Sequence, residues 1–65
     1  MSSVKERLQV EYSDLGNKIE LLENFIGSEK FENVSPVQQT LLIIQLDAMK
    51  AYRQVLSHRI QWLDD

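Results

Sequence analysis

The apolar residues of positions 36–63 most constrain how this chain can fold, because they cover more helix surface than one neighbouring helix can bury. Ser35 precedes Pro36, and Gln38 follows three residues after the serine, which is a typical helix start. We therefore predict a helix over residues 36–63. At about 100 degrees per residue, its apolar positions form two adjacent stripes that together span roughly 200 degrees, about twice the face of an ordinary surface helix.

One partner helix can cover only one of these stripes. The first contains Val37, Leu41, Ile44, Ala48, Ala51, Tyr52, Val55 and Trp62. The second contains Leu42, Leu46, Met49, Leu56, Ile60 and Leu63, and Arg53 interrupts it. The stripe that the chain's own partner helix leaves uncovered is expected to meet a second chain, a target or a ligand.

A second helix is predicted over residues 4–26. Ser3 and Glu6 have the spacing of a helix start, and Gly27 is typical of a helix end. The apolar residues of this helix are Val4, Leu8, Tyr12, Leu15, Ile19, Leu22 and Ile26, in steps of four and three from Leu8 onward. Gly16 costs this helix roughly 1 kcal/mol relative to alanine, and close approach of a partner helix is a better explanation than a functional hinge.

The connection over residues 27–35 is short, so the two helices are predicted to form an antiparallel hairpin. Phe31 and Val34 are interpreted as apolar plugs at its closed end. The predicted fold is all-α, with a single helical-hairpin domain over residues 1–65.

A chain of 65 residues buries a small core and usually needs a disulfide, a metal or a second chain. It has no cysteine and a single histidine, His58, so neither a disulfide nor a zinc site within one chain is expected. We therefore predict a homodimer or higher homo-oligomer, in its simplest form two hairpins in a four-helix bundle.

Two groups of candidate site residues follow. The predicted core and self-association residues are Leu42, Leu46, Met49, Leu56, Ile60, Leu8, Leu15, Ile19 and Leu22. The predicted partner-binding residues are Tyr52, Arg53, Arg59 and Trp62, because arginine and aromatic side chains often anchor interfaces. As alternatives, the arginines pair with acids of the first helix, and Trp62 covers Val4 and Leu8 at the open end.

Net charge and chemistry exclude other classes of function. A charge of −3 and a pI near 5.0 argue against binding to the phosphate backbone of nucleic acids. No signal peptide or membrane-spanning run is visible, which favours a cytoplasmic protein. No catalytic constellation, metal motif or cofactor motif is recognisable, and His58 is interpreted as a surface or interface residue, so an enzyme is not expected.

The residues from Glu11 to Phe31 follow the pattern ExxxLxxKIxxLxxFIxSxxF, and those from Gln38 to Ile60 follow QxxLLxxQLxAMxxYxxxLxxRI. This order resembles small proteins of temperate bacteriophages and prophages. The resemblance implies an early-region accessory protein of lambdoid type that acts on host proteins in the host cytoplasm, and no catalytic residue comes with it.

The LxAM pattern at Leu46, Ala48 and Met49, with the hairpin topology, is also similar to phage proteins that sequester cyclic nucleotide immune signals. The favoured function is a non-enzymatic regulatory protein that self-associates and binds a host or phage protein through helix faces. The alternatives are a sponge that binds a cyclic nucleotide between protomers and a nucleic-acid-associated accessory factor.

Overall fold

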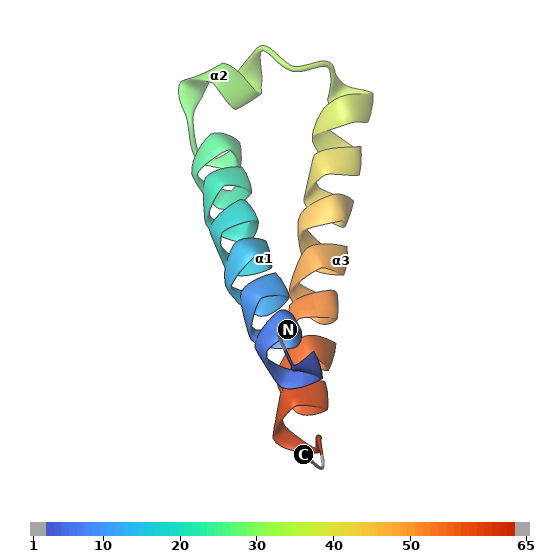
Figure 1. Ribbon diagram of the computed structural model, residues 1–65. Helices are drawn as coiled ribbons and strands as arrows, with labels where there is room; N and C mark the ends of the chain where they lie inside the picture. The colour runs from blue at the N-terminus through green and yellow to red at the C-terminus, as the bar shows by residue number, and fades with distance from the viewer. Residues whose placement is uncertain (1–2, 64–65) are drawn as a thin grey trace.

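The chain folds into two long helices that lie side by side and run in opposite directions (Figure 1). The computed structural model describes residues 3–63. Helix α1 spans Val4–Ile26, the short helix α2 spans Glu29–Glu32, and helix α3 spans Pro36–Gln61. The molecule measures 47 × 17 × 15 Å. The predicted all-helical class is confirmed. The predicted domain over residues 1–65 includes positions 1–2 and 64–65, which lie outside the described residues.

Both long helices begin at a serine cap. The Ser3 hydroxyl accepts a hydrogen bond from the backbone N–H of Glu6 at 3.1 Å, and the Ser35 hydroxyl accepts one from the backbone N–H of Gln38 at 3.4 Å. Pro36 occupies the first turn of α3, where its missing N–H has no partner to lose. Local sequence therefore sets both starting points.

The ends of the two helices differ in how they stop. Gly27 caps α1 and donates its N–H to the Glu23 carbonyl at 3.1 Å, with an ordinary φ of −82°. Helix α3 ends at Gln61 and Trp62 is its cap, so the predicted end at residue 63 was two residues too late. The apolar pattern continues through Leu63 and no glycine or proline marks the stop.

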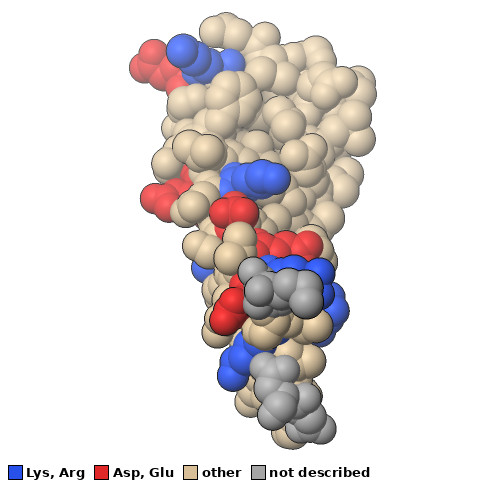
Figure 2. Space-filling view, viewed as in Figure 1, with Lys and Arg blue, Asp and Glu red and all other residues tan. Residues whose placement is uncertain are grey.

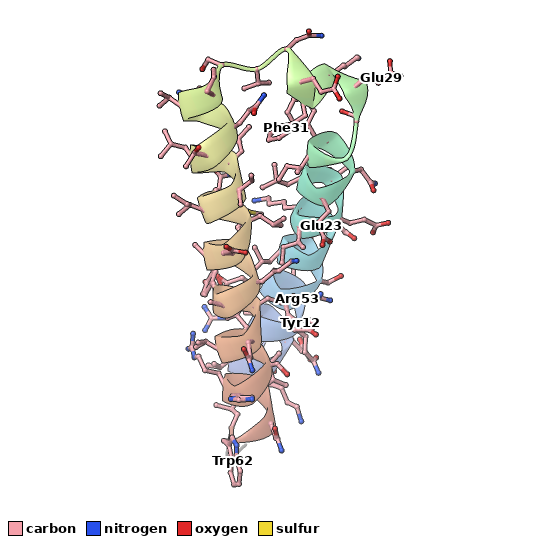
Figure 3. The ribbon with its side chains drawn as sticks, turned by 180° about the vertical axis from the view of Figure 1, so that it is seen from behind. Tyr12, Glu23, Glu29, Phe31, Arg53 and Trp62 are labelled. Carbon is pink, nitrogen blue, oxygen red and sulfur yellow. The ribbon has the colours of Figure 1, made fainter. Side chains whose placement is uncertain are left out.

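The link between the long helices is held by one glutamine and two aromatic rings. The side-chain amide of Gln39 donates to the carbonyl oxygens of Phe31 and Val34, each at 2.9 Å. The Phe25 and Phe31 rings meet edge to face with centroids 6.0 Å apart. Phe31 points into the space between the helices (Figure 3). Phe31 and Val34 are half-buried, as expected of plugs at this end.

The buried residues all lie toward the end where the start of α1 meets the end of α3. We call residues 4–19 with 49–63 the terminal half, and residues 20–48 the link half. The fully or nearly fully buried residues are Leu8, Leu15, Ile19 and Leu56. Leu56 is completely inaccessible, whereas the link half has no buried side chain among the described residues. The ribbons of α1 and α3 diverge toward α2 (Figure 1).

Candidate interaction surfaces

Helix α3 presents two apolar surfaces, and α1 covers only one of them. We call the covered surface the inner stripe; it comprises Leu42, Leu46, Met49, Leu56, Ile60 and Leu63. Every member is buried or half-buried. We call the other surface the outer stripe; it is the first predicted stripe without Tyr52, which is bonded to Glu11, and with the exposed His58, so it comprises Val37, Leu41, Ile44, Ala48, Ala51, Val55, His58 and Trp62. Every member is exposed, with exposed fractions of 69% at Val37 and 78% at Trp62.

The candidate core and self-association residues lie in the contact between α1 and α3 of one chain. Leu8, Leu15, Ile19 and Leu56 are buried, and Leu46, Met49 and Ile60 pack against them. Leu22 and Leu42 are half-buried. These nine side chains therefore face the interior of a single chain, and a role for them in self-association stays a prediction.

Arg53 is the one charged residue of α3 that lies between inner-stripe residues. Its guanidinium carbon stands 4.6 Å from the centre of the Tyr12 ring, over the ring face (Figure 3). Its Nε is buried and has no hydrogen-bond partner among the described residues. A guanidinium stacked on tyrosine in this way is stabilised by the ring's negative face.

Gly16 makes room for this guanidinium. A Cβ at position 16 would stand 3.0 Å from Nη2 and 3.2 Å from Cζ of Arg53, closer than such atoms normally pack. The close approach predicted at Gly16 is therefore made by the Arg53 side chain of α3. Sequence reasoning missed the contact because it depends on how α1 and α3 are aligned, although a glycine inside an otherwise regular helix was a signal.

The groove beside Arg53 also holds an exposed ion pair. Lys50 Nζ lies 3.1 Å from a Glu23 carboxylate oxygen, and each side chain is about half exposed. Gln54 and Ser57 line the same groove. The described residues place no carboxylate within 4 Å of Arg53, so the charge of Lys50 is matched locally and the charge of Arg53 is not.

In the groove on the other side of the helix pair, a hydrogen bond joins α3 to α1. The Tyr52 hydroxyl donates to Glu11 Oε1 at 2.5 Å. This bond raises the pKa of the Tyr52 phenol above its usual value, and desolvation and the charge of Glu11 act in the same direction. Arg7, Lys18 and Arg59 line this groove. Tyr52 is therefore already tied to α1.

The four predicted partner-binding residues do not form one site. Arg53 lines one groove, Tyr52 and Arg59 line the opposite one, and Trp62 projects beyond the end of α3. The alternative interpretation of Trp62 as a cover for Val4 and Leu8 is wrong, because its side chain is 78% exposed. Within one chain, the described residues show no pairing of Arg53 with an acid of α1, because its contact is the Tyr12 ring; pairing across a dimer stays a prediction.

Charge separates the beginning of α3 from the rest of the molecule. Residues 36–46 contain no charged side chain, and this region is uncharged on the face shown in Figure 2. Acidic and basic groups are interleaved over the terminal half on the same face. The first turns of α3 thus combine exposed apolar side chains with an absence of charge.

The described residues meet the requirements neither for a three-ligand metal site nor for a membrane-spanning helix. Within residues 3–63, no three His, Asp or Glu side chains lie close enough together to hold a metal ion. None of the described helices has the length and hydropathy needed to cross a membrane. His58 is exposed on the outer stripe of α3.

The family model described as Sequestin matches residues 2–62, nearly the full length of the sequence. This chain belongs to the Sequestin family. It is also 42% identical over 60 residues to a 7.5 kDa protein in the denB–rIIB intergenic region of Enterobacteria phage T4, covering 92% of this chain and 94% of the relative. The resemblance to small phage proteins is thereby confirmed. No solved structure matches the chain.

Proposed function

We propose that this Sequestin-family protein is a non-enzymatic phage accessory protein that self-associates and acts by holding a host or phage protein against its helix faces. The observation that carries the proposal is the outer stripe, an uncovered apolar surface that follows α3 from Val37 to Trp62. A surface of this kind on a small protein is typically an interface. The family description itself points to sequestration.

Self-association accounts for the small core. The four buried side chains of residues 3–63 are a weak hydrophobic core for a chain of 65 residues, and no disulfide supplements it. Two helix pairs that meet along α3 would cover the outer stripes of both copies and give a four-helix assembly. The chain would then act in the host cytoplasm as a dimer; its origin in the early region of a temperate, lambdoid phage stays a prediction.

The solution mass tests this assembly. We expect the wild-type protein to have twice the mass of one chain by light scattering after size-exclusion chromatography. Ile44→Glu places a charge in the centre of the outer stripe and is expected to give a helical monomer. Gln54→Glu adds the same charge on another face of α3 and should leave the dimer intact. A wild-type monomer at high micromolar concentration would contradict self-association.

Protein capture is supported by Arg59, which flanks the outer stripe, and by Trp62, which is its last residue. Arg59 and Trp62 are exposed near the end of α3, and these residue types dominate the binding energy of many interfaces. Arg59→Ala, which lies outside the outer stripe, should lose a protein that the wild type captures from infected or uninfected host lysate while keeping the mass of the dimer. Lys5→Ala is a matched surface control on α1. Identical captured proteins in all three samples would count against this docking surface.

Arg53 favours a second candidate, the capture of a cyclic nucleotide in the groove between α1 and α3; the alternative predicted from the sequence was capture between protomers. Among residues 3–63, its Nε is buried without a hydrogen-bond partner and no carboxylate lies within 4 Å of its guanidinium. A cyclic dinucleotide that binds there should raise the melting temperature of the wild type and not that of Arg53→Met. Arg7→Met removes an arginine from the opposite groove and serves as control. Absence of any shift in the wild type would remove this candidate.

A nucleic-acid accessory role has less support. Lys50, Arg53 and Arg59 are the basic residues of the second half of α3, and the acidic pI opposes binding to phosphate backbones. Such a role requires salt-sensitive retardation of DNA in a gel. Unretarded DNA at low salt would end this alternative.

A further inference from the structure

The outer stripe has a symmetric arrangement along α3. Its eight residues follow one another in steps of four, three, four, three, four, three and four, which is the spacing of a coiled-coil seam. Ala48 and Ala51 occupy the two central positions. Larger side chains lie on both sides of them, ending with Val37 at one end and Trp62 at the other. The spacing of the outer-stripe residues is therefore the same whether it is counted from Val37 or from Trp62.

We propose that the outer stripe docks on the outer stripe of a second copy of this chain, with the two α3 helices antiparallel and a twofold axis between Ala48 and Ala51. This inference rests on the self-association proposed above and specifies its interface. Four pairs repeat about the axis: Val37 with the partner's Trp62, Leu41 with the partner's His58, Ile44 with the partner's Val55, and Ala48 with the partner's Ala51.

The sizes of the side chains favour this pairing. The alanines permit the two helix axes to approach to about 8 Å at the centre, the lower end of the usual range. Toward the ends, each large side chain meets a smaller or medium-sized one, so both ends of the interface fill equally. A parallel pairing would instead place two tryptophans together at one end and two valines at the other, and would set His58 against the partner's His58.

The exposed area is also sufficient. The exposed fractions of Val37, Leu41, Ile44, Val55 and Trp62 run from 51% to 78%. For side chains of this size they correspond to on the order of 600 Å², and the alanines and histidine add to this, against roughly 800 Å² per partner in a standard stable interface. A second copy therefore covers the stripe with an interface of ordinary size.

Charge does not oppose the contact. The residues beside the stripe near its centre are Gln45, Asp47, Tyr52 and Gln54, so one acid on each copy is the only central charge. Aligned residue by residue about the axis, Asp47 lies level with the partner's Tyr52, and Arg59 lies level with the partner's Thr40. The two Asp47 side chains share one flank and are about 7.5 Å apart along the helix axes, so they are not directly opposite one another, and the antiparallel helix dipoles attract.

The inner and outer stripes are centred roughly 135 degrees apart around α3. Helix α3 would consequently lie between α1 of its own chain and α3 of the partner, so the four helices form a row instead of a square bundle around one core. The Arg53 groove lies between α1 and α3 and stays open in such a row. A target can bind there while the dimer persists.

Engineered cysteines test the pairing directly, because the natural chain has no cysteine. Ile44→Cys and Val55→Cys are made singly, mixed, unfolded and refolded together, and oxidised. The mixture should give a disulfide-linked pair on a non-reducing gel, since the two positions face each other within disulfide reach. Each variant alone should stay unlinked, because two copies of position 44 are about 16 Å apart along the helix.

Gln45→Cys mixed with Gln54→Cys is the matched control. These positions are level with one another about the same axis but point to opposite flanks, so they should stay unlinked. Crosslinking of Ile44→Cys with itself would show a parallel pair and overturn the inference. A dimeric mass without the 44–55 crosslink would overturn this interface and leave self-association standing. A monomeric wild-type mass would overturn both.

A packing test complements the crosslinks. Ala51→Leu inserts a large side chain where the helices approach most closely, and it should convert the dimer to monomer while the helical circular dichroism signal is retained. Gln54→Leu adds the same side chain outside the stripe and should leave the mass unchanged. A dimer that tolerates Ala51→Leu as well as it tolerates Gln54→Leu contradicts close contact at the alanines.

Discussion

The terminal half and the link half use the same two helices but are stabilised by different interactions. The terminal half contains Leu8, Leu15, Ile19 and Leu56, the buried residues of the described chain. The link half contains half-buried side chains and is fastened by the Gln39 amide and the Phe25–Phe31 contact. Apolar burial therefore dominates one half, and hydrogen bonding to the backbone of the link supports the other.

The difference arises from where α3 places its apolar residues. In the link half, Val37, Leu41, Ile43 and Ile44 are all exposed by 45% or more. In the terminal half, Leu56 and Ile60 turn toward α1. The exposed apolar residues of the outer stripe continue into the terminal half at Val55 and Trp62, so the halves differ in how much of α3 turns toward α1 and not in the presence of an exposed apolar surface.

The largest difference between the halves is expected from core truncation. Leu56→Ala removes a completely buried side chain and should cost about 2–5 kcal/mol of unfolding free energy, or unfold the chain outright. Leu42→Ala, in the link half, should cost about 1 kcal/mol because its side chain is already partly in water. Urea unfolding at one fixed protein concentration measures both. Equal losses would show that the halves do not differ in this way.

Within the link half, truncating a hydrogen-bonding side chain should cost more unfolding free energy than truncating an apolar one. Gln39→Ala removes both hydrogen bonds to the link and is expected to cost about 1–2 kcal/mol, more than Leu42→Ala, since each bond contributes roughly 0.5–1.5 kcal/mol. Gln38→Ala changes the neighbouring exposed glutamine and should have little effect on the same urea curve. If Gln39→Ala is as mild as Gln38→Ala, the link is not fastened by this side chain.

The Arg53–Tyr12 stack should contribute a smaller amount. A double-mutant cycle with Tyr12→Leu and Arg53→Met is expected to give a coupling energy of about 0.5–1 kcal/mol. The same cycle with Arg7→Met in place of Arg53→Met should give a value near zero, because Arg7 lines the other groove. A coupling energy near zero in both cycles would show that the stack does not contribute to the unfolding free energy.

The two glycines should respond differently to alanine. Gly27→Ala is expected to stabilise the chain by about 0.4–1 kcal/mol, because φ is ordinary there and the new Cβ would lie 3.6 Å from the Glu23 carbonyl oxygen. Gly16→Ala should give no gain despite its mid-helix position, because its Cβ would displace the Arg53 guanidinium. Thermal unfolding compares the two; a clear gain at position 16 and none at 27 would contradict this.

The smallest effect concerns pH. The Tyr52 hydroxyl donates to Glu11 only when protonated, and its pKa is raised, so this contact stabilises the fold below pH about 10 and is lost as the pH rises through the higher folded pKa. The ultraviolet absorbance of tyrosinate, measured in a Tyr12→Phe background, follows Tyr52 alone. Glu11→Gln should bring its titration back toward the ordinary range. An unchanged titration midpoint would show that the hydrogen bond does not form in solution.

Local signals in the sequence predicted where the helices begin. Ser3, Ser35 and Pro36 mark the starts, and Gly27 lies where α1 ends. The end of α3 was missed because the apolar pattern runs on past it. The sequence also showed that α3 has two apolar stripes, and the residues predicted to form the core with the first helix belong to the inner stripe, which is the one that α1 covers.

The candidate sites were less predictable than the fold. Arg53 was expected at an interface or in an ion pair, and its position over Tyr12 and Gly16 depends on a relative alignment of α1 and α3 that neither helix encodes alone. The hydrogen bond between Tyr52 and Glu11 joins residues 41 positions apart in the same way. Long-range contacts of this kind become visible only when the two helices are placed together.

The position of the buried cluster has a consequence for how the chain folds. Leu8 and Leu56 are separated by most of the sequence, so the contacts that contribute most to stability close the longest loop available. Contacts near the link, such as the two bonds of Gln39, close much shorter loops and can form first. We expect contacts between α1 and α3 to form first near the link and last in the terminal half. The folding rate is then limited by formation of the Leu8–Leu56 cluster, which has the largest loop-closure entropy cost.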